Sequence, residues 1–166
     1  MLHVLSLRLL VAHAEVPPVP TIFLPQDPVV IAVFPHRSLL DGPRLAFAFN
    51  RPVLFGVDPD YSLCEPWRSL LLTIGAITGC SMVPMQPGSS QGLRTMLRSL
   101  RSGPAGRSVC LFPQGGIDTL TDHDGARWLA RTAGVPLMRV DLDHGPGARK
   151  VRWPSVRRYA WTSTSD

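Results

Sequence analysis

The chain has 166 residues, of which 45% are hydrophobic and only 17% are charged. This length and composition exclude a disordered chain and fit one domain built around one hydrophobic core. The net charge of +5 favours anionic partners, such as nucleic acid, an anionic membrane surface, coenzyme A or an acidic carrier protein. Three widely spaced cysteines form no C-x-x-C pair, so the sequence predicts neither a disulfide framework nor a zinc site.

The first 27 residues are predicted to form an N-terminal helix followed by a Pro-rich arm. Leu2, Leu5 and Leu9 fall on one face of a helix. A secretory signal peptide is the alternative, because a small-x-small sequence of the cleavage-site type follows. Arg8 interrupts the apolar run and no basic segment precedes it, so an amphipathic helix in a cytoplasmic protein is favoured.

From residue 28 on, short apolar runs alternate with helical patterns. Five runs predict strands, several of them buried on both faces: Pro28–Phe34, Pro52–Val57, Ser81–Met85, Ser108–Phe112 and Pro136–Leu142. Four segments between them predict helices: one that begins after Asp41, one that follows Pro66, one around Leu93–Leu100 and one over Asp124–Ala133. Strands that alternate with helices indicate an α/β sandwich with a largely parallel or mixed sheet. We expect residues 28–145 to form this domain and residues 146–166 to form a basic and aromatic tail. The alternative is that the tail forms a solvated face and a final strand packed on the sheet.

A long uncharged segment runs from Ser69 to Leu93. It contains Gly75, Gly79, Pro84, Pro87 and several hydroxyl groups. A membrane-spanning helix needs about 20 mostly apolar residues. The segment is therefore predicted to be a buried helix followed by a core strand. An interfacial surface is the alternative.

The first segment with the residue types of a catalytic site is Pro35-His36-Arg37-Ser38-Leu39-Leu40-Asp41-Gly42, directly after the first predicted strand. His36 suits a general base, and Asp41 suits the partner that fixes its tautomer. Five residues of an intact helix turn by about 500°, so the two side chains meet only if the chain turns between them. The alternative is that Asp41 only caps the next helix and that His36 is an ordinary loop residue.

A second such segment is Val109-Cys110-Leu111-Phe112-Pro113-Gln114-Gly115-Gly116-Ile117. An apolar strand runs here into a proline, a polar amide and two glycines. Glycines in this position indicate a close approach of the backbone to another group, or positive φ angles. The alternative is an ordinary turn at the end of a strand.

Together, in this order and at this separation, the two segments resemble the glycerolipid (lysophospholipid) acyltransferase family. Its members carry a His-x4-Asp motif after one strand and a Phe-Pro-Glu-Gly motif after a later one. The resemblance covers about residues 28 to 143 and includes three further segments: Gly79–Pro84, Asp124–Arg127 and Ala133–Leu137. His36–Gly42 and Val83–Met85 are most similar to the branch that acts on 2-acylglycerophosphoethanolamine.

The resemblance implies a glycerol-3-phosphate acyltransferase-like sandwich and an acyl transfer reaction. A fatty acyl group would move from a thioester of coenzyme A or acyl carrier protein to a hydroxyl of a lysophospholipid or related glycerolipid. His36 would take the proton of that hydroxyl, Asp41 would stabilise the imidazolium, and neither a metal nor a further cofactor is expected. Substrate contacts are expected at these positions: Ser38, Met85, Phe112, Pro113, Gln114, Gly115, Gly116 and Pro136. Ser38 as a covalent nucleophile is disfavoured, because a hydroxyl beside a helix start usually caps the helix.

Four positions depart from the family pattern: Pro35 in place of Asn, Met85 or Gln86 in place of a phosphate-binding Arg, Gln114 in place of Glu, and Arg139 in place of a second Pro. Gln keeps a hydrogen-bonding group but loses the negative charge. These departures support an alternative in which the chain is a catalytically degenerate, lipid-binding relative. The enzyme is favoured because both members of the base pair are present.

The expected location is cytoplasmic and peripheral, on the inner face of the cell membrane. The N-terminal helix and the tail are expected to bind the anionic membrane surface. In the tail, basic residues alternate with Trp153, Tyr159 and Trp161. Nucleic acid is a disfavoured partner, because the 17 Lys and Arg residues are otherwise spread along the chain.

Overall fold

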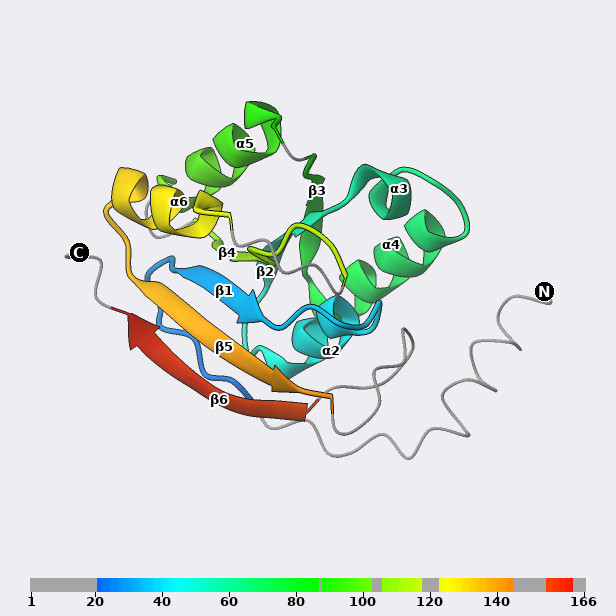
Figure 1. Ribbon diagram of the computed structural model, residues 1–166, viewed down its shortest axis with the longest axis horizontal. Helices are drawn as coiled ribbons and strands as arrows, with labels where there is room; N and C mark the ends of the chain where they lie inside the picture. Colours follow the sequence, from blue (N-terminus) through cyan, green and yellow to red (C-terminus); the bar gives the residue numbers. More distant parts are fainter. Residues whose placement is uncertain (1–20, 87, 103–105, 118–122, 145–154, 163–166) are drawn as a thin grey trace.

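The computed structural model describes residues 21–86, 88–102, 106–117, 123–144 and 155–162. In these residues a six-stranded sheet with the order β3-β2-β4-β1-β5-β6 forms the centre of the protein (Figure 1). Five strands run parallel: β1 (Val30–Phe34), β2 (Val53–Val57), β3 (Ser81–Pro84), β4 (Ser108–Leu111) and β5 (Leu137–Asp143). The sixth, β6 (Ser155–Thr162), runs antiparallel to β5. The sheet is therefore mixed, and its parallel part has all its carboxyl ends on one edge.

Helices cover both faces of this sheet (Figure 1). They are α2 (Asp41–Ala48), α3 (Pro59–Ser62), α4 (Trp67–Thr78), α5 (Ser90–Leu100) and α6 (Gly125–Ala133). One buried cluster joins the sheet to α2, and a second joins its other face to α5 and α6. The α4 helix lies on the α2 side, where Ile74 packs against the first cluster.

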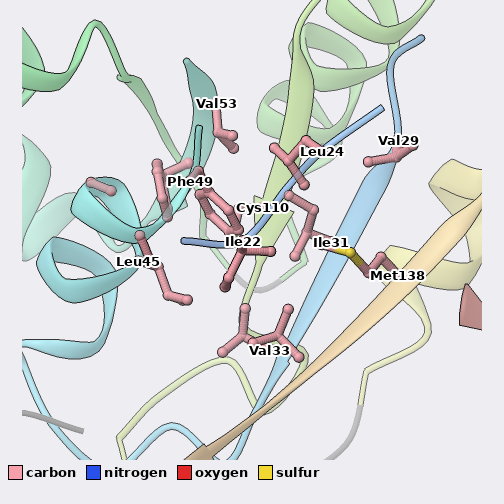
Figure 2. Close-up of a cluster of buried hydrophobic side chains, with 14 of the residues drawn as sticks. Ile22, Leu24, Val29, Ile31, Val33, Leu45, Phe49, Val53, Cys110 and Met138 are labelled. Carbon is pink, nitrogen blue, oxygen red and sulfur yellow. The ribbon is translucent and has the colours of Figure 1, made fainter. Parts of the chain in front are cut away.

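The central strand β1 contributes to both buried clusters. Ile31 and Val33 point toward the α2 side, and both are fully buried (Figure 2). Val30 and Ala32 alternate with them and pack on the opposite side, toward α5 and α6. A strand covered on both faces has no solvent side, and its sequence is therefore a continuous apolar run.

The α/β class and the five predicted strands are confirmed, with ends that differ by at most two residues. One helix was not predicted, and one strand was expected only as the alternative for the tail. The α3 helix is a single turn that begins with Pro59, and the side chain of Asp58 caps it by accepting from the backbone N–H of Asp60. The β6 strand falls within the segment expected to be a tail, and it pairs with the whole length of β5.

The Pro-rich arm is part of the core where the structure describes it, and the helix predicted before it lies outside the described residues. Ile22 and Leu24 are buried, and Ile22 forms a parallel bridge with Phe49. The side chain of Asn50 accepts from the backbone N–H of Leu24 at 2.8 Å. Residues 21–28 therefore cover the α2 side of the sheet.

The helix and the strand predicted between Ser69 and Leu93 are present, but the burial predicted for both of them is wrong. The helix is α4, which contains no buried residue, and Ile77 in it is 68% exposed. The strand is β3, which lies at the edge of the sheet and is only partly buried. The physical reason is that α4 lies beside a cavity, and in this helix only Ile74 packs against a buried cluster.

Gly92 lies where α5 comes closest to the end of β3. A Cβ atom at this position would lie 2.2 Å from Met85 Sδ and 2.7 Å from the carbonyl oxygen of Pro84. Because a backbone carbonyl cannot move aside, we expect Gly92→Ala to lower the free energy of unfolding by about 1–3 kcal/mol. Thermal denaturation would record a Tm lower by roughly 2–4 °C per kcal/mol.

Gly125→Ala is the matched control, because a Cβ there meets only Leu93 Cδ2, at 3.7 Å. This helical position is expected to gain roughly 0.5–1 kcal/mol from the substitution. Equal losses of Tm in both variants would contradict the assignment of a special close approach to Gly92.

Candidate active site

The candidate site lies at the carboxyl edge of the parallel strands. The chain after β1 leads to α2 on one face of the sheet, while the chain after its neighbour β4 leads to α6 on the other face. A crevice forms where the loops of adjacent parallel strands diverge in this way, and α/β proteins commonly bind ligands there. His36 and Phe112 come from these two loops.

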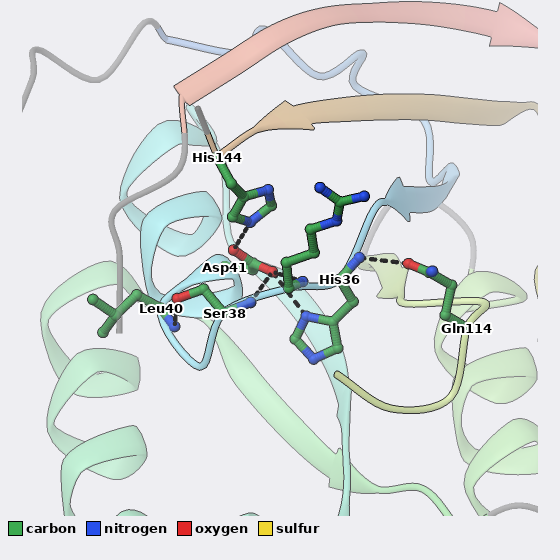
Figure 3. A network of polar contacts seen from close by, with 7 residues as sticks. His36, Ser38, Leu40, Asp41, Gln114 and His144 are labelled. Atoms are coloured by element: carbon green, nitrogen blue, oxygen red, sulfur yellow. Dashed lines mark hydrogen bonds and ion pairs between the residues drawn. The ribbon is translucent and has the colours of Figure 1, made fainter. Parts of the chain in front are cut away.

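Asp41 carries the most strongly buried carboxylate of the site, with a side chain that is 0% exposed. Its Oδ2 accepts from His36 Nδ1 at 2.9 Å, and from the backbone N–H groups of Arg37 at 2.9 Å and Ser38 at 3.0 Å. Its Oδ1 accepts from His144 Nε2 at 2.8 Å (Figure 3). The interpretation of Asp41 as a mere helix cap is wrong, because α2 has Leu40 as its N-cap and no side-chain capping bond.

His36 is fixed from three directions. Its Nδ1 faces Asp41, its ring stacks on Phe112 with the centroids 4.1 Å apart, and its backbone N–H donates to Gln114 Oε1. Because an ionised carboxylate only accepts, the ring proton is assigned to Nδ1 and the lone pair to Nε2. Nε2 lies on the side of the ring away from Asp41, and His36 lines a cavity next to α3 and α4. A neutral imidazole in this arrangement can act as a general base.

A cavity of about 1060 Å³ opens beside His36. It lies between α3, α4, the ends of β2 and β3, and the loops that follow β1 and β4. Most of its lining is apolar: Phe55, Leu70, Leu71, Ile74, Met82, Leu93 and Leu111 are examples. Five of the residues predicted to contact substrate also line it: Met85, Phe112, Pro113, Gly115 and Gly116.

Gln114 has a different place from the one expected. It does not line the cavity; its side-chain carbonyl accepts from the backbone N–H of His36 and so joins the loop after β4 to the loop after β1 (Figure 3). A glutamate would offer an oxygen to the same N–H. The departure from the Phe-Pro-Glu-Gly pattern therefore keeps this contact. Gly115 follows with a φ of 70°, and a Cβ there would meet the ring of His123 at 3.0 Å.

Ser38 supports the turn between His36 and Asp41. Its side chain is buried, its Oγ accepts from the backbone N–H of Leu40 at 3.1 Å, and it is not among the cavity-lining residues. Cys110 is no alternative nucleophile, because complete burial in the core raises the pKa of its thiol well above the usual range and keeps it protonated.

Pro136 is not brought together with the other predicted residues. It lies directly before β5, at the amino edge of the parallel sheet, where its carbonyl accepts from the backbone N–H of Val30 at 3.0 Å. Arg139, which departs from the family pattern, lies with its guanidinium 4.6 Å from the ring centroid of Phe34 and pairs with Asp141 at 2.9 Å. Neither residue lines the cavity.

Two histidines of the site were missed by sequence reasoning. His144 contacts Asp41 directly, and His123 lines the cavity beside Gly115. A signal for His144 was present, because it follows a predicted parallel strand and the carboxyl ends of such strands meet at one edge. Within the described ranges, His, Cys, Asp and Glu side chains form no group of three or more that could hold a metal ion.

A comparison of the sequence with the models of known protein families gives no match, and neither does a comparison with curated proteins. The resemblance to the glycerolipid acyltransferases therefore stays a prediction. The geometry of the site is the evidence on which a function can be proposed.

The bond between Gln114 and His36 gives a prediction that needs no assumption about function. Gln114→Leu removes the acceptor of the His36 amide, whereas Gln114→Glu keeps one. We expect the His36 amide to exchange with solvent roughly 2- to 10-fold faster in Gln114→Leu, as fits the ~0.5–1.5 kcal/mol of a hydrogen bond. NMR-detected hydrogen exchange measures this. Equal exchange rates in the two variants would remove Gln114 from its role in holding His36.

Proposed function

We propose that this protein is an acyltransferase that moves a fatty acyl group from an acyl thioester to a hydroxyl of a lysophospholipid or related glycerolipid. The observation that carries the proposal is that His36 pairs with a fully buried aspartate and also lines a large apolar cavity. A base that faces an apolar cavity suits a substrate with one reacting hydroxyl and a long hydrocarbon chain.

The reaction needs only the groups of the His36–Asp41 pair and two substrates. Nε2 of His36 takes the proton of the acceptor hydroxyl, and Asp41 stabilises the imidazolium through Nδ1. The acceptor oxygen attacks the thioester carbonyl carbon, and a tetrahedral intermediate forms. The C–S bond then breaks, and the leaving thiolate takes the proton back from Nε2. The donor is a thioester of coenzyme A or of acyl carrier protein.

The cavity supports the lipid part of the proposal. Its volume of about 1060 Å³ is slightly above the roughly 300–1,000 Å³ typical of small-molecule sites, so a long chain fits. The partly buried side chains on α4 that line it include Leu70, Leu71 and Ile74. Each methylene group buried against such a surface contributes about 0.8 kcal/mol, so a fatty acyl chain would bind mainly through this wall.

The exposed apolar residues of α4 support the proposal that the protein works at a lipid surface. Four large apolar residues on or beside this helix are between 36% and 68% exposed: Leu63, Trp67, Leu72 and Ile77. The first three also line the cavity, so the exposed apolar surface is continuous with it. Among the described residues, no helix is both long and apolar enough to cross a membrane. Attachment is therefore proposed to be peripheral, on the inner face of the cell membrane, with α4 next to the lipid. The N-terminal helix predicted for this role lies outside the described residues.

The catalytic part is tested by substitution of the base pair. His36→Ala is expected to lower the rate of acyl transfer by about 10²–10⁴-fold, the usual contribution of a general base. Asp41→Asn is expected to be nearly as harmful, because an amide cannot stabilise the imidazolium as a carboxylate does. The measurement is the formation of diacyl product from labelled acyl thioester and a panel of lysolipids, with Tm as the check on folding.

Near-normal turnover in a folded His36→Ala variant would overturn the mechanism. Lipid binding by the wild type without any diacyl product, across both donors and all acceptors, would instead support the catalytically degenerate, lipid-binding alternative.

The membrane part is tested by liposome flotation. Ile77→Ser is expected to bind at least about tenfold more weakly, because a buried side chain of this size contributes roughly 1.5–3 kcal/mol and Ile77 does not line the cavity. The control is Trp128→Ser in α6, since Trp128 is 45% exposed but lies in a helix on the other face of the sheet. Binding is also expected to favour anionic vesicles and to weaken at high salt. Equal losses in the variant and the control would exclude α4 as the attachment site.

A further inference from the structure

His144 is a buried histidine that the mechanism above does not use. It follows β5 directly, and its side chain is 3% exposed. Its Nε2 lies 2.8 Å from Asp41 Oδ1, on the side of the carboxylate opposite His36 (Figure 3). One carboxylate therefore lies between two imidazole rings, although the two histidines are 108 residues apart in the sequence (144 − 36).

The two oxygens of Asp41 are supported unequally. Oδ2 accepts from three donors, which are His36 Nδ1 and the backbone N–H groups of Arg37 and Ser38. Oδ1 accepts only from His144 within the described residues. Because the carboxylate is fully buried, no water replaces this donor if it is lost. His144 thus supports the one oxygen of the carboxylate that the turn after β1 does not hold.

The protonation of His144 follows from its surroundings. Its Nδ1 is buried and has no hydrogen-bond partner in the described residues. A buried N–H without an acceptor is more unfavourable than a buried lone pair. Because a carboxylate oxygen only accepts, the proton is assigned to Nε2, which faces Asp41 Oδ1. Two elements that meet here also carry charged groups: Arg44 in α2, and Asp141 and Asp143 in β5.

We infer that His144 is a positioning residue that holds the Asp41 carboxylate aimed at His36. The two rings then carry opposite tautomers, with the proton on Nδ1 in His36 and on Nε2 in His144. The kinetic consequence of this inference rests on the proposed acyl transfer, whereas the tautomers do not depend on it. The bland alternative is a core histidine that stabilises the fold and has no effect on His36.

The test that needs no activity is NMR of the ¹⁵N-labelled histidine rings in the full chain. In the wild type, one ring is expected as a fixed Nδ1–H tautomer and is assigned to His36, and another as a fixed Nε2–H tautomer assigned to His144. His144→Leu is expected to release the His36 ring into a mixture of tautomers. His144→Gln keeps an N–H donor and is expected to preserve the His36 signal. Leu142→Val, at a buried position in β5 two residues before His144, is the control for a general loss of packing.

The kinetic readout separates positioning from folding. His144→Leu is expected to lower kcat by about 10- to 100-fold, the size of a lost hydrogen bond to a charged group, while KM changes less than about threefold. His144→Gln should recover most of that loss, and Leu142→Val should leave kcat near the wild-type value.

Two results overturn the inference. One is a His144 ring in the wild type that carries its proton on Nδ1 or exchanges freely between tautomers, which can be measured even if His144→Leu does not fold. The other is a folded His144→Leu variant with an unchanged His36 signal and an unchanged kcat. A His36 tautomer that depends on His144, in a protein that transfers no acyl group to any acceptor, would support the inference and contradict the proposed function.

Discussion

The Asp41 carboxylate is completely buried, and a charge removed from water is stable only where hydrogen-bond donors replace the water. Four donors do so here, and they come from two parts of the chain: three from the turn after β1, which contains His36, and one from His144 after β5. Each of these parts is held in place by the sheet. The charged group at the centre of the site therefore depends on the pairing of β1 with β5, and the function proposed for the site depends on that charge.

The same dependence explains why the site lies where it does. Strands β4, β1 and β5 are adjacent, and their carboxyl ends deliver Phe112, His36 and His144 to one small region. Because the loops after β1 and β4 diverge to opposite faces, the ring of His36 has space on one side for a ligand. The side-chain carbonyl of Gln114 joins the two loops by accepting from the backbone N–H of His36.

Much of the fold could be predicted from local patterns, because buried parallel strands are short apolar runs and helices repeat their apolar residues with a different period. The pair His36 and Asp41 was also within reach, since both lie in one turn. What local pattern could not supply was the sheet order, on which the contact of His144 with Asp41 depends. The exposure of α4 was missed for a related reason: its apolar composition is typical of a core helix, and only the tertiary structure places it beside a cavity.

The shallow packing of α4 has a consequence for how a hydrocarbon chain could reach the cavity. A helix without buried residues loses little contact area when it moves, so the free energy of its local opening is small compared with that of global unfolding. The wall of the cavity that α4 provides can therefore yield while the sheet and the His36–Asp41 pair stay in place. A long chain would then enter sideways from a lipid layer, without first passing through water.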